Sequence, residues 1–419
     1  MLEDEQNDSN PKQDEGNKST YMIPPKIAYY DTNLNAVGMD FGTTECCAAV
    51  IRKYGPDFVV LGSTSERTMP SYVAFDEKEP KCGQIVIDRM RHKSEYSVFD
   101  IKRIIGKSIE QISIDPFWPF KIIKNKEENV LIEVETFNGK ETKSPEEISA
   151  VLLSRMKMII QEYQKSKLLD AAIVITIPAK FSDQQKNSLK TAAKISRWNN
   201  IHFLPEPVAA AFTYFTEKYI LNNSNILICD FGGGTVDICV AKVSNEELKI
   251  LNFDGDLYLG GRDFDNILYT HFHAVLRQKF GIDVTKTRKK YVLNKKCQEI
   301  KHTLSAADVN EHWLDVDDFD NDSDKIIKIT KEEFEDISLP LIVRIKDVIL
   351  RTVSHSNLQK NDINYVFQVG GGCRMPMIKK LLFGIFPESN HQCYLYPDWA
   401  VAHGAALYAY YLQTHNTQK

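Results

Sequence analysis

The sequence predicts an α/β protein built from two duplicated lobes. Residues 36–61 and 226–251 follow the same pattern: an apolar strand that ends in Asp-Phe-Gly, a tight turn, a second strand and a third. Segments with helical periodicity alternate with the strands, and residues 171–177 form an almost continuous apolar run, which is typical of a strand covered on both faces. Strands that alternate with helices indicate sheets buried between helical layers.

Cap signals fix where several helices begin. Ser144-Pro145-Glu146-Glu147 is a capping box with proline at the first helical position, and it precedes the periodic stretch 148–163. Residues 330–333 cap a further helix in the same way. Residues 400–411 form a last predicted helix, in which Gly404 would allow a close approach to a neighbouring element.

Size and charge exclude several classes of protein. The chain has 419 residues, 43% of them hydrophobic, and a formal net charge of -5. Most of that charge lies in residues 1–20, so the remainder is nearly neutral and does not suit non-specific binding to nucleic acid. No signal peptide or membrane span is visible, which predicts a cytoplasmic protein with access to the nucleus. We expect the eight cysteines to be reduced and mostly buried.

The two Asp-Phe-Gly turns carry the chemistry. Asp40-Phe41-Gly42-Thr43-Thr44 places a carboxylate, a glycine and two hydroxyls at the end of a strand, and residues 230–237 repeat this design with three glycines and a second aspartate. Exposed backbone N–H groups in such turns bind anions. Each turn alone could be an ordinary hairpin, but the duplication favours two phosphate-binding turns that face each other across a cleft. Asp40, Asp230 and Asp237 would then converge on a hydrated Mg²⁺ ion.

A third glycine-rich segment, residues 369–376, follows a strand and opens a helix, a position suited to nucleotide contact. It lacks the third glycine of a dinucleotide fingerprint, and the chain contains no P-loop. The aspartate-rich stretch 315–324 begins like a calcium loop. It has Ser323 where that loop needs glycine and Ile329 where it needs glutamate, so we expect a solvated turn there.

These three motifs, in this order, resemble those of the actin-like ATPase superfamily. Further segments resemble the nucleotide-binding domain of the seventy-kilodalton heat-shock chaperones, namely residues 98–106, 118–120, 177–181, 205–211, 259–265 and 397–402. The resemblance covers about residues 36–412 and implies ribonuclease-H-like lobes with a nucleotide cleft between them. The predicted division is a disordered tail (1–35), lobe I (36–219 plus 392–412), lobe II (220–391) and a C-terminal tail (413–419), with no peptide-binding domain.

By the same resemblance, Lys102 reaches the γ-phosphate and the attacking water. The other residues predicted to order the water, the metal and the phosphates are Glu206, Asp230, Thr235 and Asp237, with Asp40, Asp230 and Asp237 holding the metal through water. Predicted nucleotide contacts are Gly42, Thr43, Thr44, Gly232, Gly233, Gly234, Thr235, Gly260, Gly261, Gln298, Lys301, His302, Ser305, Gly371, Gly372, Arg374 and Asp398.

Some positions depart from the family pattern. Gln298, His302 and Gly372 stand where the family usually has Glu, Arg and Ser, which predicts an altered nucleotide affinity because imidazole lacks the guanidinium plane and its fixed charge. Lys186 replaces an arginine that transmits movement from Pro178, and Lys180 replaces an aromatic residue. His202 lies in a stretch where the family uses a basic residue to dock J-domain co-chaperones, so we expect weaker docking.

The resemblance implies a stress-response chaperone ATPase that binds ATP or ADP with Mg²⁺, with K⁺ as a further candidate cation. The expected partners are nucleotide and other chaperones or nucleotide-exchange factors, for a monomeric protein that binds neither membranes nor nucleic acid. A nucleotide-dependent scaffold that does not hydrolyse ATP is the main alternative. A filament-forming relative of actin would need self-complementary surfaces, and a sugar kinase would need a sugar pocket.

Overall fold

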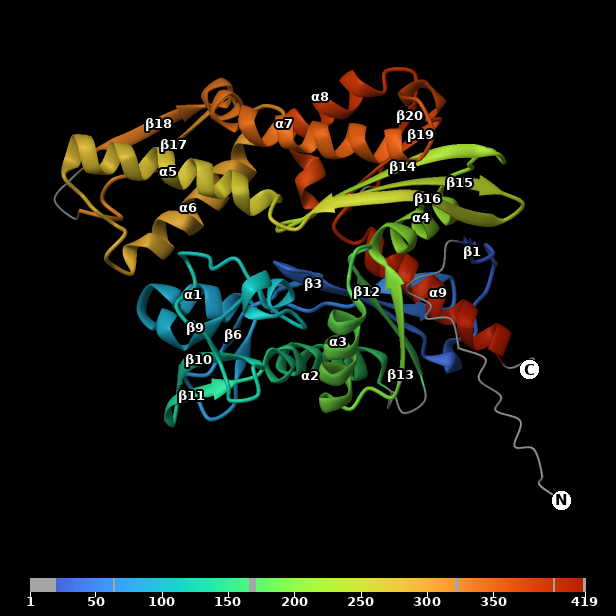
Figure 1. Cartoon of the computed structure of the whole chain (residues 1–419), viewed down its shortest axis with the longest axis horizontal. Coiled ribbons are helices and arrows are strands. Elements are labelled where there is room, and N and C mark those ends of the chain that lie inside the picture. Colours follow the sequence, from blue (N-terminus) through green and yellow to red (C-terminus); the bar gives the residue numbers. More distant parts are fainter. Residues whose placement is uncertain (1–19, 63–64, 166–170, 321–323, 395, 417–419) are drawn as a thin grey trace.

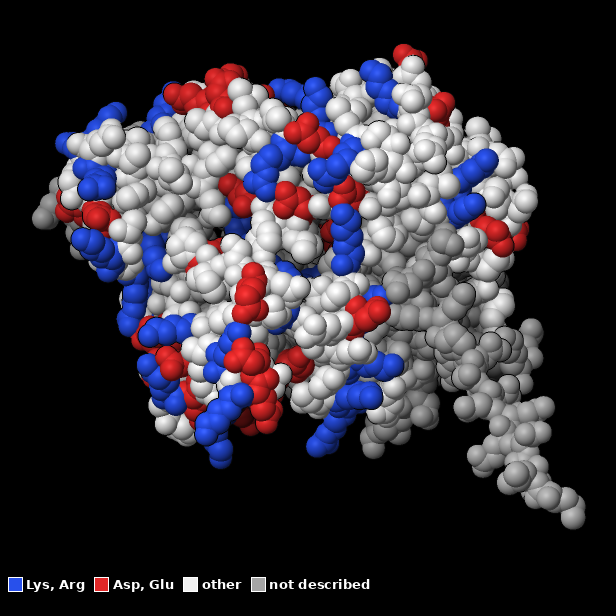
Figure 2. All heavy atoms as spheres, in the orientation of Figure 1, with Lys and Arg blue, Asp and Glu red and all other residues white. Residues whose placement is uncertain are grey.

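The computed structural model describes residues 20–62, 65–165, 171–320, 324–394 and 396–416. It confirms an α/β protein with two lobes, seen one above the other in Figure 1. In these residues lysines and arginines are interspersed with aspartates and glutamates over the face shown in Figure 2, in keeping with the nearly neutral body of the chain. All eight cysteines are free thiols, and six are buried, as expected.

Lobe I is built on a mixed sheet whose strands follow the order β13-β12-β2-β3-β4, with β5 paired to β3. The predicted buried strand is confirmed as β12, which is parallel to both of its neighbours. The bounds are β2 Val37–Phe41, β3 Glu45–Arg52, β4 Gly55–Phe58, β5 Thr68–Pro70, β12 Ala172–Ile177 and β13 Asn200–Pro205. Helices α2 (Pro145–Gln164) and α3 (Asp183–Ile195) belong to this lobe, and both begin at capping boxes.

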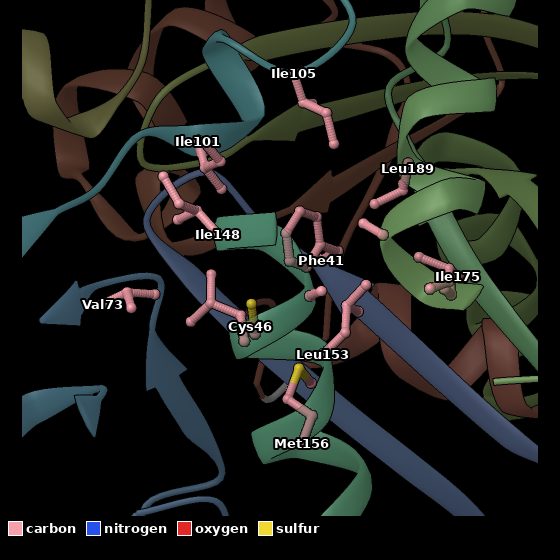
Figure 3. Packing of buried hydrophobic residues seen from close by; sticks show 14 of the residues in the cluster. Phe41, Cys46, Val73, Ile101, Ile105, Ile148, Leu153, Met156, Ile175 and Leu189 are labelled. Carbon is pink, nitrogen blue, oxygen red and sulfur yellow. The ribbon is translucent and has the colours of Figure 1, made fainter. Parts of the chain in front are cut away.

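A smaller unit of lobe I carries two three-stranded sheets and helix α1 (Gln84–Lys93). One sheet has the order β7-β6-β8 and the other β11-β10-β9, with bounds β6 Val73–Ala74, β7 Lys81–Cys82, β8 Ser97–Val98, β9 Lys121–Lys124, β10 Val130–Thr136 and β11 Gly139–Lys143. Figure 3 shows the core of lobe I, where Leu153 and Met156 of α2 lie near Phe41 and Cys46 of the first hairpin.

Lobe II is built on a six-stranded sheet of order β1-β16-β15-β14-β19-β20. Its bounds are β1 Thr20–Met22, β14 Ser224–Phe231, β15 Val236–Ser244, β16 Glu247–Asp256, β19 Tyr365–Val369 and β20 Asn390–Cys393, and a separate hairpin pairs β17 Glu311–Asp315 with β18 Ile326–Thr330. Its helices are α5 Gly261–Phe280, α6 Lys289–Leu304, α7 Lys331–His355 and α8 Pro376–Ile385. The predicted cap at Thr330 is confirmed at the start of α7.

The duplication extends further than the two turns that reveal it in the sequence. In lobe I, β2, β3 and β4 form an antiparallel meander, and β12 and then β13 add to β2 in parallel. In lobe II, β14, β15 and β16 form the same meander, and β19 and then β20 add to β14 in parallel. The two sheets therefore share one topology, and each ends its first strand in a turn at the same place.

Helices α4 (Glu206–Glu217) and α9 (Ala400–Asn416) lie where the lobes meet, and α4 contacts strands of both main sheets. Their facing surfaces are rich in alanine and glycine, which lets the helices approach closely. The expectation for Gly404 is confirmed, because a Cβ atom built on it would lie 1.7 Å from the carbonyl oxygen of Ala209. A single apolar core thus continues from one lobe into the other.

Three predicted boundaries need correction. Residues 20–35, assigned to a disordered tail, are folded. Strand β1 pairs with β16, and Tyr21 is buried. The edge of the lobe II sheet supplies the apolar surface that covers Tyr21, and the local sequence does not reveal it. Helix α9 continues to Asn416, beyond the predicted end of lobe I at residue 412. The boundary at residue 392 falls inside β20 of the lobe II sheet. Residues 1–19 lie outside the described residues.

His403 of α9 is expected to make stability depend on pH. Burial lowers the pKa of His403 to about 4, whereas the unfolded chain has a value near 6.5. The unfolded state therefore binds a proton between these values, and the stabilisation present above pH 6.5 is lost as the pH falls. Between pH 7 and pH 5 this histidine should cost about 2 kcal/mol.

Urea unfolding at several pH values measures this effect, with His403→Gln as the comparison because glutamine does not titrate. The free energy of unfolding of the variant should fall less steeply with decreasing pH than that of the parent. Identical slopes for the two proteins would refute the assignment of this loss to His403.

Candidate functional site

The two Asp-Phe-Gly turns touch each other across the seam between the lobes. A Cβ atom built on Gly233 would lie 2.1 Å from Oγ1 of Thr44, and one on Gly234 would lie 2.7 Å from Cγ2 of Thr43. Gly260, at the start of α5, packs as tightly against the backbone of the same glycine turn. Glycine at these positions leaves room for the threonine side chains of the other lobe, which a Cβ atom would displace. The turns therefore form one continuous surface at the bottom of a cleft.

A cavity of about 590 Å³ opens over these turns. It is large enough for a nucleotide-sized ligand. Of the predicted site residues, those that line it are Asp40, Gly42, Thr43, Thr44, Lys102, Glu206, Asp230, Gly232, Gly233, Gly234, Thr235, Gly261, Gln298, Lys301, His302, Ser305, Gly371, Gly372, Arg374 and Asp398. Asp237 and Gly260 lie behind this wall: Asp237 is paired in register with Asp230, and Gly260 supports the glycine turn.

Backbone contacts fix the orientation of the glycine turn. The N–H of Gly261 donates to the carbonyl of Gly232 at 3.0 Å, and that of Arg262 donates to the carbonyl of Gly233 at 2.8 Å. In a trans peptide the N–H points opposite to the C=O. The N–H groups of Gly233 and Gly234 are therefore turned away from the start of α5. Such a run of directed N–H groups is suited to binding an anion.

Lys102 and Glu206 form a buried ion pair in the cavity wall, with side chains only 5% and 7% exposed. Burial by itself would lower the pKa of Lys102, but the negative charges of Glu206 and Asp40 outweigh it and raise that pKa. The ammonium group is therefore charged at neutral pH. The short segment η4 (Ile101–Arg103) holds Lys102 in place, and Glu206 is the first residue of α4.

The aspartates around this pair carry more negative charge than one lysine offsets. Burial, and then repulsion from Glu206, raise the pKa of Asp40 and that of Asp237 to about 7. The same two causes raise the pKa of Asp230 well above its ordinary value. Such a cluster is expected where a bound cation compensates the carboxylates in the working protein.

These residues fit a hydrated Mg²⁺ ion. Carboxylate oxygens are its preferred protein ligands, and it usually keeps several waters. In the described part of the chain, three potential ligand atoms come within 4.8 Å of one another only at Asp315, Asp317 and Asp318, on the surface far along lobe II. The wider spacing of Asp40, Asp230 and Asp237 agrees with binding through water. Asp315 to Asp318 lie at the aspartate-rich turn expected to be solvated, and Asp315 and Asp317 are not buried.

Another part of the cavity wall carries basic and polar side chains. Lys301 donates to Asp265 at 2.9 Å and to the carbonyl of Gly261 at 2.9 Å, so its ammonium group is fixed beside the glycine turn. Arg374 pairs with Asp398 at 2.5 Å. Desolvation in the cleft, together with the charge of Lys301, lowers the pKa of His302 to about 4, so its ring is neutral at pH 7.

Several residues that support the site were not predicted. Arg103 donates to the carbonyl of Gly234 at 2.6 Å, across the seam from lobe I to lobe II. Arg262 contacts the fully buried Asp100, which also accepts a hydrogen bond from Nε1 of Trp118 at 2.9 Å. Asp265 positions Lys301 as described above. Asp100 and Arg103 lie in the motif 98–106, and Arg262 and Asp265 lie in the motif 259–265. A charged side chain inside one of these motifs was the signal from which the sequence could have predicted a supporting residue.

The residues that depart from the family pattern have partners in this chain. Lys180 pairs with Asp254, which also binds Arg351. Lys186 is buried in α3 and lies 3.2 Å from Asp183. His202 is hydrogen-bonded to Asn200 at 2.9 Å. Weaker J-domain docking stays a prediction.

Two lobes of one topology, with a glycine turn and a threonine turn that meet at a cleft between them, are typical of the actin-like ATPase fold. Within that class, residues 36–419 match the family model described as Hsp70 protein, and the chain belongs to the Hsp70 family. It is 33% identical over 390 residues to the Heat shock 70 kDa protein of Emericella nidulans, covering 92% of this chain and 59% of that protein. It is 32% identical over 383 residues to Heat shock cognate 70 kDa protein 3 of Dictyostelium discoideum, covering 90% of this chain and 60% of that protein.

The chain thus spans about 60% of the length of these curated relatives. Among the described residues, none of the helices combines the length and the apolar character that a membrane crossing requires.

Proposed function

We propose that this chain binds ATP and ADP in the cleft and hydrolyses ATP slowly with Mg²⁺, and that the bound nucleotide sets the angle between the lobes. The observation that carries this proposal is the direct contact of the two glycine and threonine turns, one from each lobe, at Gly233 with Thr44 and at Gly234 with Thr43. A ligand bound by both turns must hold the lobes together. Other chaperones or exchange factors would respond to that closure.

The geometry suits phosphoryl transfer. Directed N–H groups of Gly233 and Gly234 and the hydroxyls of Thr43 and Thr235 would bind the phosphates, with Lys102 next to the terminal one. Glu206 fixes the position of Lys102, so the positive charge is in place before the substrate arrives. Asp40, Asp230 and Asp237 would hold Mg²⁺ through water, and the ion would neutralise phosphate charge and orient the chain of phosphates. Lys301, Arg374 and His302 would contact the nucleoside end.

Calorimetric titration with ATP and with ADP tests the binding step. Both should bind in the presence of Mg²⁺, and chelation of Mg²⁺ should weaken binding at least about tenfold, because the buried aspartates then repel the phosphates. Absence of binding for both nucleotides would overturn the proposal. An Asp318→Asn variant in the surface aspartate group is the matched control, and its affinity should equal that of the parent.

The scaffold that binds nucleotide without cleaving it remains the second candidate. The neutral ring of His302, where the family usually has arginine, favours it because one fixed charge at the nucleoside end is missing. Single-turnover hydrolysis of ATP separates the two candidates. A protein that binds ATP and leaves it intact over hours is a scaffold.

A further inference from the structure

Residues 20–35 precede the part of the chain that matches the Hsp70 family model, yet they contact both lobes. We propose that this segment, called the strap here, is a regulatory tie that holds the two lobes at a fixed angle and so limits the opening of the cleft. The consequence for nucleotide release rests on the proposed function, whereas the restraint on lobe motion does not.

One end of the strap is bound to lobe II. Strand β1 pairs antiparallel with the edge strand β16, with Thr20, Tyr21 and Met22 opposite Lys249, Leu248 and Glu247. The pairing continues through Ile23, whose N–H donates to the carbonyl of Glu246 at 2.9 Å. Tyr21 is 3% exposed and belongs to the apolar core shared by α4, α9 and both sheets. This end is therefore fixed by backbone pairing and by burial of a large side chain.

The other end of the strap is bound to lobe I. The N–H of Tyr30 donates to the carbonyl of Lys53, in the β3–β4 turn, at 2.9 Å. The N–H of Asp31 donates to the hydroxyl of Tyr410 at 3.1 Å, and the rings of Tyr30 and Tyr410 meet edge to face at 5.0 Å between centroids. Lys53 lies in a turn between two strands of the lobe I sheet, and Tyr410 lies on helix α9, which packs on that sheet. Only seven residues separate Met22 from Tyr30.

The link between the two ends is short and stiff. It contains Pro24 and Pro25, which fix φ and favour an extended chain. The covalent chain otherwise passes between the lobes twice, after α4 and after β20, so the strap adds a third connection at the same end of the seam. In Figure 1 β1 lies beside α9 at one end of the seam, and α1 faces α6 at the other. Rotation of the lobes must stretch or compress the strap.

The lobe contacts at the far end combine exposed ion pairs with aromatic packing. The rings of Phe117 and Tyr269 meet edge to face at 4.9 Å, and the hydroxyl of Tyr291 donates to the carbonyl of Phe117 at 3.2 Å. Lys295 of α6 lies 3.0 Å from Asp88 of α1, and Arg288 lies 2.7 Å from Glu95. Exposed pairs of this kind contribute little and exchange readily with water. The far end is thus held by partly exposed contacts, whereas at the other end of the seam the strap adds a buried side chain to the shared core.

Hydrogen exchange of the full-length protein without nucleotide tests the restraint directly. Tyr21→Ser should release β1 and accelerate exchange of the far-end segments 84–95 and 288–296 at least about fivefold, the lower range of coupling between sites. Met22→Ser is the matched control, because Met22 is the next residue on the strand and is 44% exposed. Its exchange should equal that of the parent. Tyr30→Ala, at the other end of the strap, should act like Tyr21→Ser.

A reversible crosslink supplies the rescue. Met22 and Glu247 are directly opposite in the register, so their Cα atoms lie within the range that a disulfide spans. The crosslinked variant combines Tyr21→Ser with Met22→Cys and Glu247→Cys, in a Cys393→Ser background. When the disulfide is oxidised, the far-end segments should exchange at the rate of the parent. When it is reduced, exchange should again be as fast as in Tyr21→Ser. Release of a fluorescent ADP should follow the same order, faster in Tyr21→Ser and restored by the disulfide.

Three outcomes are decisive. Fast exchange in β1 of Tyr21→Ser with unchanged exchange at residues 84–95 and 288–296 would overturn the strap. Faster exchange there that the disulfide reverses would establish it, even if the parent binds no nucleotide. Absence of nucleotide binding by the parent would refute the proposed function alone. Should Tyr21→Ser fail to fold, Tyr30→Ala decides by the same measurements.

Discussion

Replacement of Lys102 by alanine is expected to slow single-turnover ATP hydrolysis at least about 100-fold. Lys102 carries a positive charge fixed beside Glu206, Asp40 and Asp237, and preorganised charge of this kind contributes factors of about 100 to 1,000 to the rate. The measurement is the cleavage of radiolabelled ATP by excess protein. Equal rates for the parent and the variant would refute a role for Lys102 in the reaction.

Loss of Lys102 also leaves Glu206 buried without its partner, which should cost about 3 to 5 kcal/mol of stability. A slow variant could therefore be a partly unfolded one. The double variant Lys102→Met with Glu206→Gln removes both charges and keeps the volume of the side chains. Its thermal stability should lie above that of Lys102→Ala, while its hydrolysis stays slow. Lys121→Ala, an exposed lysine on β9, should hydrolyse ATP at the parent rate.

The second large effect is expected at the helix crossing between the lobes. Gly404→Ala should destabilise the protein by about 3 kcal/mol or more, because the new methyl group would meet the carbonyl oxygen of Ala209 and force α4 and α9 apart. Helix propensity alone would give the opposite sign, since alanine is favoured over glycine by about 1 kcal/mol. The steric cost decides the outcome, and urea unfolding measures it.

Gly384 provides the matched control for that prediction. It also lies in a helix, α8, but a Cβ atom built on it has no heavy atom within 4 Å in the described structure. Gly384→Ala should therefore leave stability unchanged or raise it by up to about 1 kcal/mol. A Gly404→Ala protein as stable as the parent would show that the two helices can separate without cost.

Local patterns predicted the parts of the fold that depend on nearby residues. The capping boxes at Ser144 and Thr330, the buried strand β12 and the two Asp-Phe-Gly turns follow from neighbours within a few positions, and the structure contains them. Twenty of the residues assigned to the site from motifs line one cavity. Their roles toward nucleotide and metal stay predictions, which the titration and turnover experiments address.

The features that the sequence did not reveal depend on contacts between distant segments. The local sequence places Tyr21 in a polar tail. Strand β16, more than 220 positions later, supplies the sheet edge with which Tyr21 pairs, and residues of both lobes supply the apolar core that buries it. The local sequence around Arg103 does not indicate a partner in lobe II. Arg103 reaches the carbonyl of Gly234 only because the two lobes meet at the seam. The pairing of Arg262 with Asp100 likewise needs both lobes.

The sequence alone therefore determined the class of fold, the duplication and most of the residues that line the cleft, because glycines, caps and carboxylates act within a few residues of the chain. Only the tertiary structure decided how the lobes are held together. Burial of Tyr21, the close crossing at Gly404 and the excess of negative charge around Lys102 arise from desolvation and packing between segments that are far apart in sequence. No local pattern encodes those distances.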